Sequence, residues 1–195
     1  MQNISKHISY IKSYFNIINV SVIKENRYFF YKKNICLNKK EALYIKGKNG
    51  SGKTTLLRLA IGLKKFHEGS ILWYNSYSHT RMFFLPNDSN LNFKDITLIP
   101  IIYEQTSHLK FLVNLLSKHI NEKFEKLSTG EKKITQLSNL IIYPSPIWLL
   151  DEPESNLDEI NQLKLKLAIN LHLKNMGILF ITTHKQNLYK YSIYL

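Results

Sequence analysis

The chain has little cysteine and no long apolar run, and each shortage excludes a class of protein. Its single cysteine, Cys36, cannot form an internal disulfide, which fits a reducing compartment. No apolar stretch approaches the roughly 18–20 residues that a membrane-spanning helix needs. Lysine and histidine interrupt the apolar residues of 1–20, which lack a signal-peptide core and a cleavage site. We therefore do not expect the protein to be secreted.

Arginine is also scarce, although the chain is strongly basic. The formal net charge is +13 and 27 residues are lysine or arginine, yet only Arg27, Arg58 and Arg81 are arginine. Arginine is the better residue for bidentate contacts with phosphate, so its scarcity argues against a nucleic-acid partner. Lysine, asparagine, isoleucine, tyrosine and phenylalanine dominate the chain, and AT-rich codons encode all of them. We attribute much of the charge to codon usage, while an acidic partner or anionic lipid headgroups stay open as alternatives.

Short apolar runs alternate with longer helical patterns, which predicts an α/β fold with a mostly parallel sheet flanked by helices. A length of 195 residues suits a single domain. Between Pro86 and Pro144 the strand pattern lapses, which predicts a core of residues 1–86 and 144–195 with a small helical insert at about 87–143. We expect strands at 42–46, 70–74, 82–85, 147–150 and 177–182, and helices at 53–63, 107–120, 130–142 and 156–175.

A glycine-rich segment between a predicted strand and a predicted helix carries the most specific motif. Residues 47–54 read GKNGSGKT and match the phosphate-binding pattern G-x-x-x-x-G-K-[ST] of P-loop NTPases. Such a loop points backbone N–H groups at phosphate oxygens, and the positive end of the next helix faces the same anion. We predict that Lys53 contacts the β- and γ-phosphates of ATP and that the Thr54 hydroxyl is a ligand of Mg²⁺. The expected nucleotide-binding residues are Gly47, Lys48, Asn49, Gly50, Ser51, Gly52, Lys53, Thr54 and Thr55.

Two adjacent carboxylates, Asp151 and Glu152, follow the apolar strand at 147–150. Open α/β folds bind their ligands at the carboxyl edge of the sheet, where both side chains would lie. We predict that Asp151 holds Mg²⁺ through water and that Glu152 orients or deprotonates the water that attacks the nucleotide. An acidic turn without chemistry is the alternative, and the phosphate loop makes it the weaker one. The sequence thus predicts a protein that hydrolyses a nucleotide, or at least binds one.

Residues 126–133, KLSTGEKK, contain a serine followed three residues later by glutamate. Ser128 and Glu131 have the spacing of a capping box, in which each side chain accepts from a free N–H group at a helix start. This pattern is common and carries no chemistry by itself. A helix start is nevertheless a ready site for an anion, so a ligand contact is the second interpretation.

The order of these motifs resembles that of the ATP-binding subunits of ABC transporters. LSTGE (127–131) stands where that family has a signature close to LSGGQ, SNLD (155–158) is similar to its D-loop, and ITTH ends at His184 like its switch histidine. The resemblance implies an ATP-dependent head-to-tail homodimer, in which Ser128 and the N–H groups around Gly130 contact the γ-phosphate bound by the partner. It also implies that Asp158 belongs to the nucleotide site and that His184 acts on the same phosphate or on the catalytic water.

Several positions depart from the family pattern. Thr129 replaces a small residue, and Glu131 replaces a glutamine, which puts a carboxylate unfavourably near the partner's triphosphate. The expected Q-loop glutamine is missing, so Asn87 or Asp88 stands near the Mg²⁺ position, and Asp88 is the candidate ligand. Tyr28 is the candidate for stacking on adenine. These departures leave ATP binding in place and the rate of hydrolysis open.

Among small free-standing members, the chain most resembles the ATP-binding subunit of cytochrome c maturation, the CcmA type. Residues 47–75 look like that subunit's loop, helix and next strand, and the segment ITTHKQNL is also similar. The resemblance implies a peripheral subunit on the cytoplasmic or mitochondrial matrix side of an inner membrane. It would work with membrane permease subunits to drive haem release, without binding haem or nucleic acid itself. The residue usage suggests an organellar genome or a bacterial endosymbiont.

Three alternatives stay open from the residues alone. One is the ATP-binding subunit of another small ABC transporter, since most matched segments are common to all such cassettes. A second is a non-transport ATPase that acts on nucleic acid, which the net charge of +13 suggests. A third is a structural cassette that binds ATP without useful hydrolysis, which Glu131 and the missing glutamine suggest.

Overall fold

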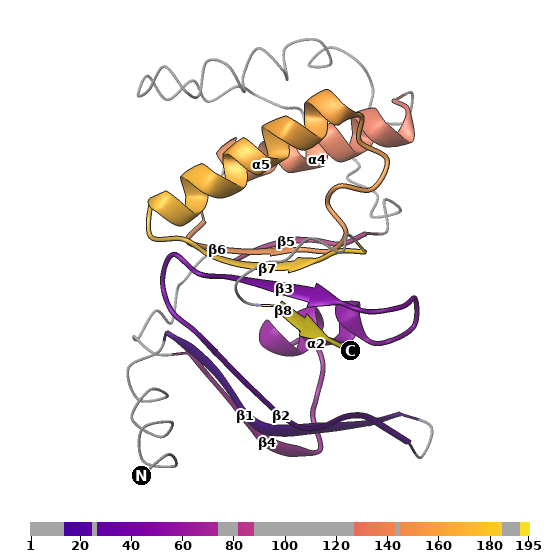
Figure 1. Cartoon of the computed structure of the whole chain (residues 1–195), viewed down its shortest axis with the longest axis vertical. Helices are drawn as coiled ribbons and strands as arrows, with labels where there is room; N and C mark the ends of the chain where they lie inside the picture. The colour runs from indigo at the N-terminus through magenta and orange to yellow at the C-terminus, as the bar shows by residue number, and fades with distance from the viewer. Residues whose placement is uncertain (1–13, 25–26, 74–81, 88–126, 143–144, 185–191) are drawn as a thin grey trace.

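Two sheets of different kind organise the chain in the computed structural model, which describes residues 14–24, 27–73, 82–87, 127–142, 145–184 and 192–195 (Figure 1). All neighbouring strands of the larger sheet are parallel, and all pairs of the smaller one are antiparallel. The larger sheet has the order β5 (Met82–Leu85), β6 (Ile147–Leu150), β7 (Ile178–Thr182), β3 (Ala42–Lys46) and β8 (Ser192–Tyr194). The smaller has the order β2 (Arg27–Leu37), β1 (Phe15–Lys24) and β4 (Glu68–Trp73).

The central strands β6 and β7 are buried along their whole length. Their continuous apolar sequences, IWLL and ILFIT, are typical of parallel strands that are covered on both faces. Helices α4 (Thr129–Ile142) and α5 (Glu159–Lys174) cover one face, whereas α2 (Lys53–Ala60) lies between the parallel and the antiparallel sheet (Figure 1). The carboxyl ends of the parallel strands therefore meet at one edge, where the loops that follow them come together.

Apolar side chains fill both spaces beside the parallel sheet. Between the two sheets, the ring of Phe15 meets that of Phe180 edge to face, 4.9 Å between centroids. The Trp73 indole N–H donates to the carbonyl of Ala60 at 3.1 Å, which fastens β4 to α2. The second core, beneath α4 and α5, consists mainly of Leu85, Leu140, Trp148, Leu150, Leu165, Ala168, Ile169, Leu179 and Ile181.

The predicted α/β fold is confirmed, but its second sheet is not foreseen. Four of the five predicted strands form the parallel sheet, whereas the strand expected at 70–74 pairs antiparallel with β1 as β4. Strands β1, β2 and β8 are not predicted from the sequence. Buried Asn16 and Ser21 on β1 break the expected alternation of apolar and polar residues, and irregular pairing with β2 shifts its register.

Three of the predicted helices form: α2 and α5 are shorter than predicted, whereas α4 begins one residue earlier, at Thr129. Helix α4 packs on the sheet beside α5, although the prediction counts it with the insert (Figure 1). The predicted helix at 107–120 lies outside the described residues, and the boundaries of the insert stay a prediction. No helix in the described part of the chain has both the length and the apolar character to cross a membrane.

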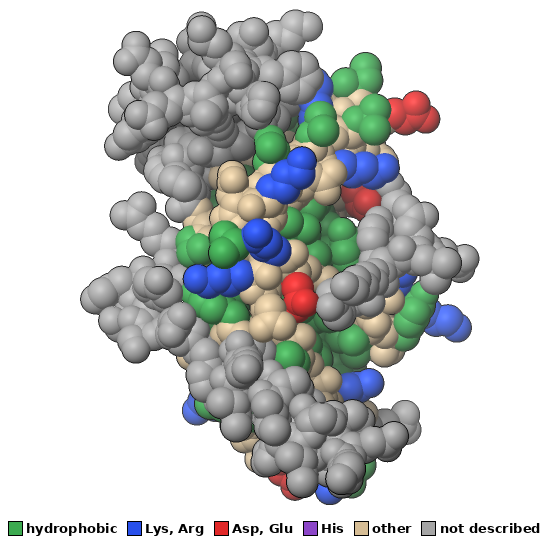
Figure 2. Space-filling view, turned by 60° about the vertical axis from the view of Figure 1, so that its left-hand side comes forward, with side chains coloured by type: hydrophobic (Ala, Val, Ile, Leu, Met, Phe, Trp, Pro, Cys, Tyr) green, Lys and Arg blue, Asp and Glu red, His purple; other side chains and the backbone are tan. Residues whose placement is uncertain are grey.

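On the face shown in Figure 2, the described lysine side chains do not form a single patch. Figure 2 shows them interspersed with hydrophobic side chains and a few carboxylates on one face of the molecule. Helix α5 contributes exposed residues of both kinds, among them Leu163, Lys166 and Leu167.

Candidate functional site

The glycine-rich loop lies at the carboxyl end of β3 and leads directly into α2. Gly50 and Gly52 have φ values of 80° and 103°, left-handed conformations that side chains rarely adopt. The ring of Phe29 from β2 lies against Gly52, so a Cβ there would also collide with it. Helix α2 starts without a side-chain cap and without an acidic residue in its first turn. Its first N–H groups and its dipole are therefore available to an anion.

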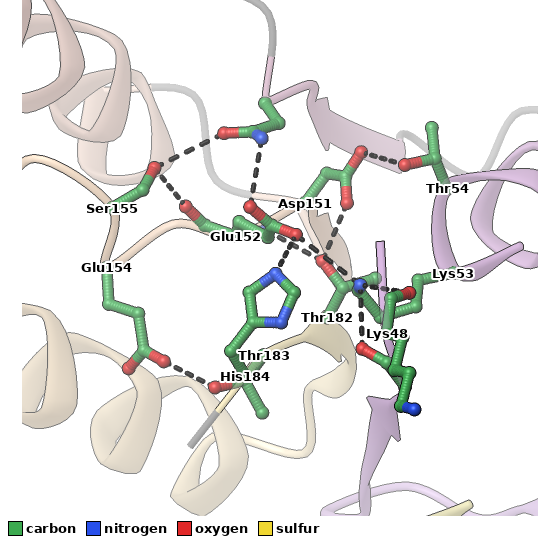
Figure 3. Close-up of polar contacts among 12 residues, drawn as sticks. Lys48, Lys53, Thr54, Asp151, Glu152, Glu154, Ser155, Thr182, Thr183 and His184 are labelled. Carbon is green, nitrogen blue, oxygen red and sulfur yellow. Dashed lines mark hydrogen bonds and ion pairs between the residues drawn. The ribbon is translucent and has the colours of Figure 1, made fainter. Parts of the chain in front are cut away.

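The Lys53 ammonium lies inside this loop. Its Nζ donates to the carbonyls of Gly47 and Lys48 at 3.0 and 3.2 Å, and it lies 3.7 Å from Oε1 of Glu152 (Figure 3). The residue is only 6% exposed. The buried Ser51 hydroxyl has no hydrogen-bond partner among the described residues. The Lys53 ammonium and the Ser51 hydroxyl, surrounded by backbone groups of the loop, form a cradle suited to phosphate oxygens.

Two threonine hydroxyls hold the carboxylate of Asp151. Thr54 at the start of α2 donates to Oδ2 at 2.7 Å, and Thr182 at the end of β7 donates to Oδ1 at 2.6 Å. Asp151 is 2% exposed, and its own N–H donates to the carbonyl of Leu85 at 2.8 Å. The Thr182 hydroxyl also accepts from the N–H of Glu152 at 2.7 Å. The carboxyl ends of β5 and β7 and the start of α2 thus fix the aspartate beside the phosphate loop.

Glu152 is the centre of a second set of contacts (Figure 3). Nε2 of His184 lies 2.7 Å from its Oε1, and the side-chain amide of Asn87 donates to its Oε2 at 3.0 Å. Ser155 donates to the side-chain oxygen of Asn87 at 3.2 Å and to the backbone carbonyl of Glu152 at 2.8 Å. The φ of Glu152 is 47°, an uncommon conformation for a residue with a side chain. The surrounding contacts hold this carboxylate in one place next to Lys53.

Ser128 and Glu131 form the capping box that their spacing predicts. Oε2 of Glu131 accepts from the Ser128 N–H at 2.8 Å and from its hydroxyl at 2.7 Å. The Ser128 hydroxyl accepts in turn from the Glu131 N–H at 3.3 Å. Gly130 in the same turn faces the backbone of Asn156, which precedes α5. The backbone of the segment before α5 therefore lies directly against the first turn of α4.

Three further predicted residues lie apart from this cluster or outside the description. Asp158 is the N-cap of α5, where its Oδ1 accepts from the Asn161 N–H at 2.7 Å. Tyr28 is 56% exposed on β2 and packs edge-on against Tyr31, while its neighbour Phe29 touches the phosphate loop. Asp88 lies outside the described residues. Any role of these three in nucleotide binding stays a prediction.

The structure adds Thr182 and Ser155 to the contacts around the carboxylates, and it brings Asn87, named from the sequence near the Mg²⁺ position, into contact with Glu152. Thr182 is fully buried, and its position opposite Asp151 follows from the pairing of β6 with β7. Ser155 begins the SNLD segment and Asn87 follows β5, but nothing in their spacing indicates that they meet. Only the sheet order, which no local pattern reveals, brings the three together.

The Thr54 and Asp151 oxygens suit a magnesium ion. Mg²⁺ prefers hydroxyl, carboxylate and phosphate oxygens, and it usually keeps several of its waters. Among the described residues no group of three or more histidine, cysteine, aspartate and glutamate side chains could hold a metal ion. One carboxylate and one hydroxyl at 2.7 Å beside a phosphate cradle match an ion that nucleotide phosphates help to bind.

Comparison with known proteins agrees with this site. The family model for ABC transporters matches residues 30–155, which include the phosphate loop, the Ser128 helix start and both carboxylates. The chain belongs to the ABC transporter family. The predicted family, fold and class of enzyme are thereby confirmed, whereas the role of each single residue stays a prediction.

Relatives within the ABC transporter family include proteins of cytochrome c biogenesis. The chain is 33% identical over 188 residues to the cytochrome c biogenesis ATP-binding export protein CcmA of Reclinomonas americana, covering 86% of this chain and 83% of that one. It is 34% identical over 185 residues to ABC transporter I family member 1 of Arabidopsis thaliana, covering 85% and 80%. CcmA of Aliivibrio fischeri is 28% identical over 186 residues, covering 87% and 91%.

Solved ABC cassettes have the same fold. A putative ABC transporter ATP-binding protein from Pyrococcus furiosus superposes with a TM-score of 0.73 at 23% identity, covering 93% of this chain and 96% of that chain. A cassette solved as a dimer in a post-hydrolysis state with ADP and Pi gives the same TM-score at 21% identity, covering 93% and 94%.

Proposed function

We propose that the chain is the ATP-binding and ATP-hydrolysing subunit of an ABC transporter that serves cytochrome c biogenesis. The observation that carries the hydrolytic part is the meeting of Lys53, Asp151, Glu152 and His184 at one edge of the sheet. The cytochrome c part rests on relatives that are named for cytochrome c biogenesis. The match to this chain covers most of the length of each. That subunit would drive haem release or delivery through its membrane partners, and it would not bind haem itself.

Each side chain has a chemical role in this proposal. When ATP binds, Lys53 exchanges the carbonyls of Gly47 and Lys48 for phosphate oxygens, which compensate its charge better. Glu152 accepts a proton from the attacking water or orients it, because its carboxylate lies 3.7 Å from Lys53 and beside the cradle. His184, at 2.7 Å from Glu152, holds that carboxylate and reaches toward the γ-phosphate.

Thr54 and Asp151 would hold Mg²⁺, which supplies charge neutralisation on the phosphates when it is bound. The Thr182 hydroxyl keeps Asp151 in its orientation by donating to the other carboxylate oxygen. Asp88 and Tyr28 are further candidates, for the metal and for adenine. The fixed carboxylate therefore needs little rearrangement to accept the ion.

A second copy of the chain would complete the site. The N–H groups of the α4 first turn and the Ser128 hydroxyl lie at a helix start that presents positive partial charge. In a head-to-tail homodimer this helix start contacts the γ-phosphate held by the partner's loop, and Asp158 lies near the same interface. Glu131 binds Ser128 in the single chain, so the hydroxyl must rotate away from that carboxylate to reach a phosphate.

The proposed location is peripheral, on the cytoplasmic or mitochondrial matrix side of an inner membrane. The transport pathway would belong to separate permease subunits. The organellar or endosymbiont origin rests on the residue usage, which AT-rich codons explain. Adjacent genes for a cytochrome c maturation permease would support the assignment.

A nucleic-acid ATPase is the second candidate because the net charge is +13. On the face shown in Figure 2, lysines are scattered among hydrophobic side chains instead of forming one basic stripe. We therefore favour the transporter. Strongly salt-dependent binding of DNA or RNA would reverse this preference, and no binding at low salt would remove the candidate.

Two substitutions test the hydrolytic proposal. In the purified full chain, Lys53→Ala should abolish binding of a fluorescent ATP analogue, and Glu152→Gln should bind ATP but release no phosphate. The Glu152→Gln chain should also elute as a dimer with ATP and as a monomer without it. Unchanged turnover of the Glu152→Gln chain would contradict the role of Glu152. Binding of ATP without turnover by the unsubstituted chain and permease would favour a structural cassette.

Complementation tests the cytochrome c part. The chain should restore haem-containing c-type cytochrome in a bacterium that lacks its own cytochrome c biogenesis ATP-binding protein. The Lys53→Ala chain, expressed at the same level, is the matched control and should restore none. If the active chain does not restore haem-containing cytochrome while it still hydrolyses ATP, another small ABC transporter becomes the better assignment.

A further inference from the structure

A lysine outside the family motifs is buried beneath α4. Lys133 is only 4% exposed, although lysine is rarely buried without a partner. Its Nζ is fully covered and has no hydrogen-bond partner among the described residues. Within this described part of the chain, the ammonium is therefore neither a surface charge nor one half of a salt bridge.

Lys133 occupies a position where the helix pattern calls for an apolar residue. It precedes Leu137 by four residues and Leu140 by seven, so all three share the inner face of α4. Leu140 belongs to the core beneath this helix, and Leu137 packs against it. An apolar side chain of similar length would fill this space without burying a charge. Keeping an ammonium here costs stability, which suggests that it has another role.

The start of α4 lies next to the segment that carries the two carboxylates of the candidate site, since Gly130 meets the backbone of Asn156, four residues after Glu152. Burial lowers the pKa of Lys133, whereas attraction by Asp151 and then by Glu152 raises it. Both carboxylates directly follow β6, whose Trp148 and Leu150 share the core beneath α4 with Leu140. The electrostatic attraction between Lys133 and these carboxylates therefore links α4, which starts at the capping box, to the residues beside the phosphate loop.

We propose that Lys133 is a positioning residue that fixes the start of α4 relative to Asp151 and Glu152 during ATP hydrolysis. The proposal rests on the proposed function, since it assigns a task only if both carboxylates act on ATP. Lys133 follows Gly130 by one helical turn, so its attraction to the carboxylates pulls on the turn that carries Ser128. In a low-dielectric interior this attraction needs no direct hydrogen bond.

The arrangement also relates the two ATP sites of a dimer. Asp151 and Glu152 serve the ATP bound by their own chain, whereas the start of α4 serves the ATP of the partner. When triphosphate charge arrives beside the carboxylates, the force on Lys133 changes, and so does the preferred position of α4.

Lys133→Met tests this proposal, because methionine keeps the length of the side chain and removes the charge. In the full chain we expect kcat for phosphate release to fall about tenfold, since small misplacements of catalytic groups have effects of at least this size. The KM for ATP should change less than about twofold, because the phosphate loop itself is untouched. The melting temperature should stay equal or rise, because an unpaired buried charge is removed.

Two matched variants complete the experiment. Lys166→Met makes the same change on the exposed side of α5 and should leave kcat unchanged. Lys133→Arg keeps the positive charge and should restore at least about half of the lost activity, which a purely volume-filling role would not predict.

The outcomes separate the possibilities. Equal kcat in the Lys133→Met and unsubstituted chains overturns the proposal, as does an equal loss in Lys133→Met and Lys133→Arg. A Lys133→Met chain with a lowered melting temperature or lost ATP binding would show that Lys133 is structural, which also overturns it. If the unsubstituted chain releases no phosphate, the proposed function fails first and this inference fails with it.

Discussion

Gly130 in the first turn of α4 lies directly against the backbone carbonyl of Asn156, although 26 positions separate them in the sequence. A Cβ on Gly130 would be 2.8 Å from that oxygen, closer than real Cβ atoms come. The segment resembling the signature and the segment resembling the D-loop are therefore in contact within one chain. This close approach explains why glycine stands in a helix, where it normally costs stability.

Gly130→Ala tests this contact, because the contact should reverse the change in the free energy of unfolding that alanine normally causes in a helix. In an unhindered helix, glycine to alanine adds about 1 kcal/mol to the free energy of unfolding. Here the methyl group pushes against backbone, so we expect a loss of about 1–2 kcal/mol instead. Urea denaturation measures the difference. Thr129→Ala, an exposed neighbour in the same turn, is the control and should change stability by less than about 0.5 kcal/mol. A more stable Gly130→Ala chain would show that the contact is absent.

Thr182→Val tests how the carboxylates are held. Valine keeps the shape of threonine but removes the hydroxyl that donates to Asp151 and accepts from the Glu152 N–H. Because Thr182 is fully buried, both partners lose a hydrogen bond without gaining water, which should cost about 1–3 kcal/mol of folding stability. We also expect kcat to fall about tenfold, because both carboxylates lose their fixed orientation.

Thr183→Val is the matched control for that substitution. Its hydroxyl donates to Glu154, which lies outside the contacts around Asp151, so kcat should fall much less. Phosphate release and chemical denaturation of the two variants separate loss of stability from loss of positioning. Equal kcat values for both would show that Thr182 only stabilises the fold.

The sequence predicts those parts of the fold that depend on local patterns. Continuous apolar runs reveal β6 and β7 because both strands are buried on both faces. The antiparallel sheet stays hidden because Asn16 and Ser21, both polar, are buried in β1, and because its pairing with β2 is irregular. The pairing of β1 with β4 also joins segments about fifty residues apart, which no local rule detects.

In the candidate site, too, local motifs can be predicted from the sequence, whereas contacts that depend on strand order cannot. The motifs around Lys53, Asp151 and His184 are visible because their chemistry needs certain residues at certain spacings. Thr182 and the contact of Asn87 with Glu152 are not visible, because both depend on which strands are neighbours in the sheet. Lys133 is missed for another reason: a lysine in a helix normally faces solvent, and only the packing of α4 shows that this one is buried.

His172 should make the fold sensitive to acid. Its ring stacks on Trp148 at 3.8 Å between centroids, and Nε2 lies 3.1 Å from the carbonyl oxygen of Ile178. Burial lowers the pKa of His172 below its ordinary value of 6.5, and the contact with Ile178 only partly opposes this. Below that ordinary value the unfolded chain binds the proton more readily than the folded chain does. The contribution of neutral His172 to folding stability is thus fully present above pH 6.5. It is lost as the pH falls from that value toward the lowered pKa of the folded chain.

His172→Gln should reduce this pH dependence. Glutamine can donate to the Ile178 carbonyl from nearly the same place but does not titrate. The free energy of unfolding, measured in urea between about pH 8 and about pH 5.5, should fall less steeply than in the unsubstituted chain. Leu165→Val, which weakens the same core without a titratable group, is the control and should keep the original slope. An unchanged slope in His172→Gln would show that other groups cause the sensitivity.

Glu131→Gln tests whether the departure from the family signature weakens the dimer. Glutamine can still accept from the Ser128 N–H, so we expect the fold to lose no more than about 1 kcal/mol. Removing the negative charge should favour approach of the partner's triphosphate. In a chain that also carries Glu152→Gln, the ATP-dependent dimer should become about fivefold tighter by light scattering. Glu68→Gln, the same charge change at the exposed start of β4 in the antiparallel sheet, should not affect the dimer. If dimer affinity does not increase, Glu131 is only a cap, and Ser128 reaches a phosphate equally well beside either residue.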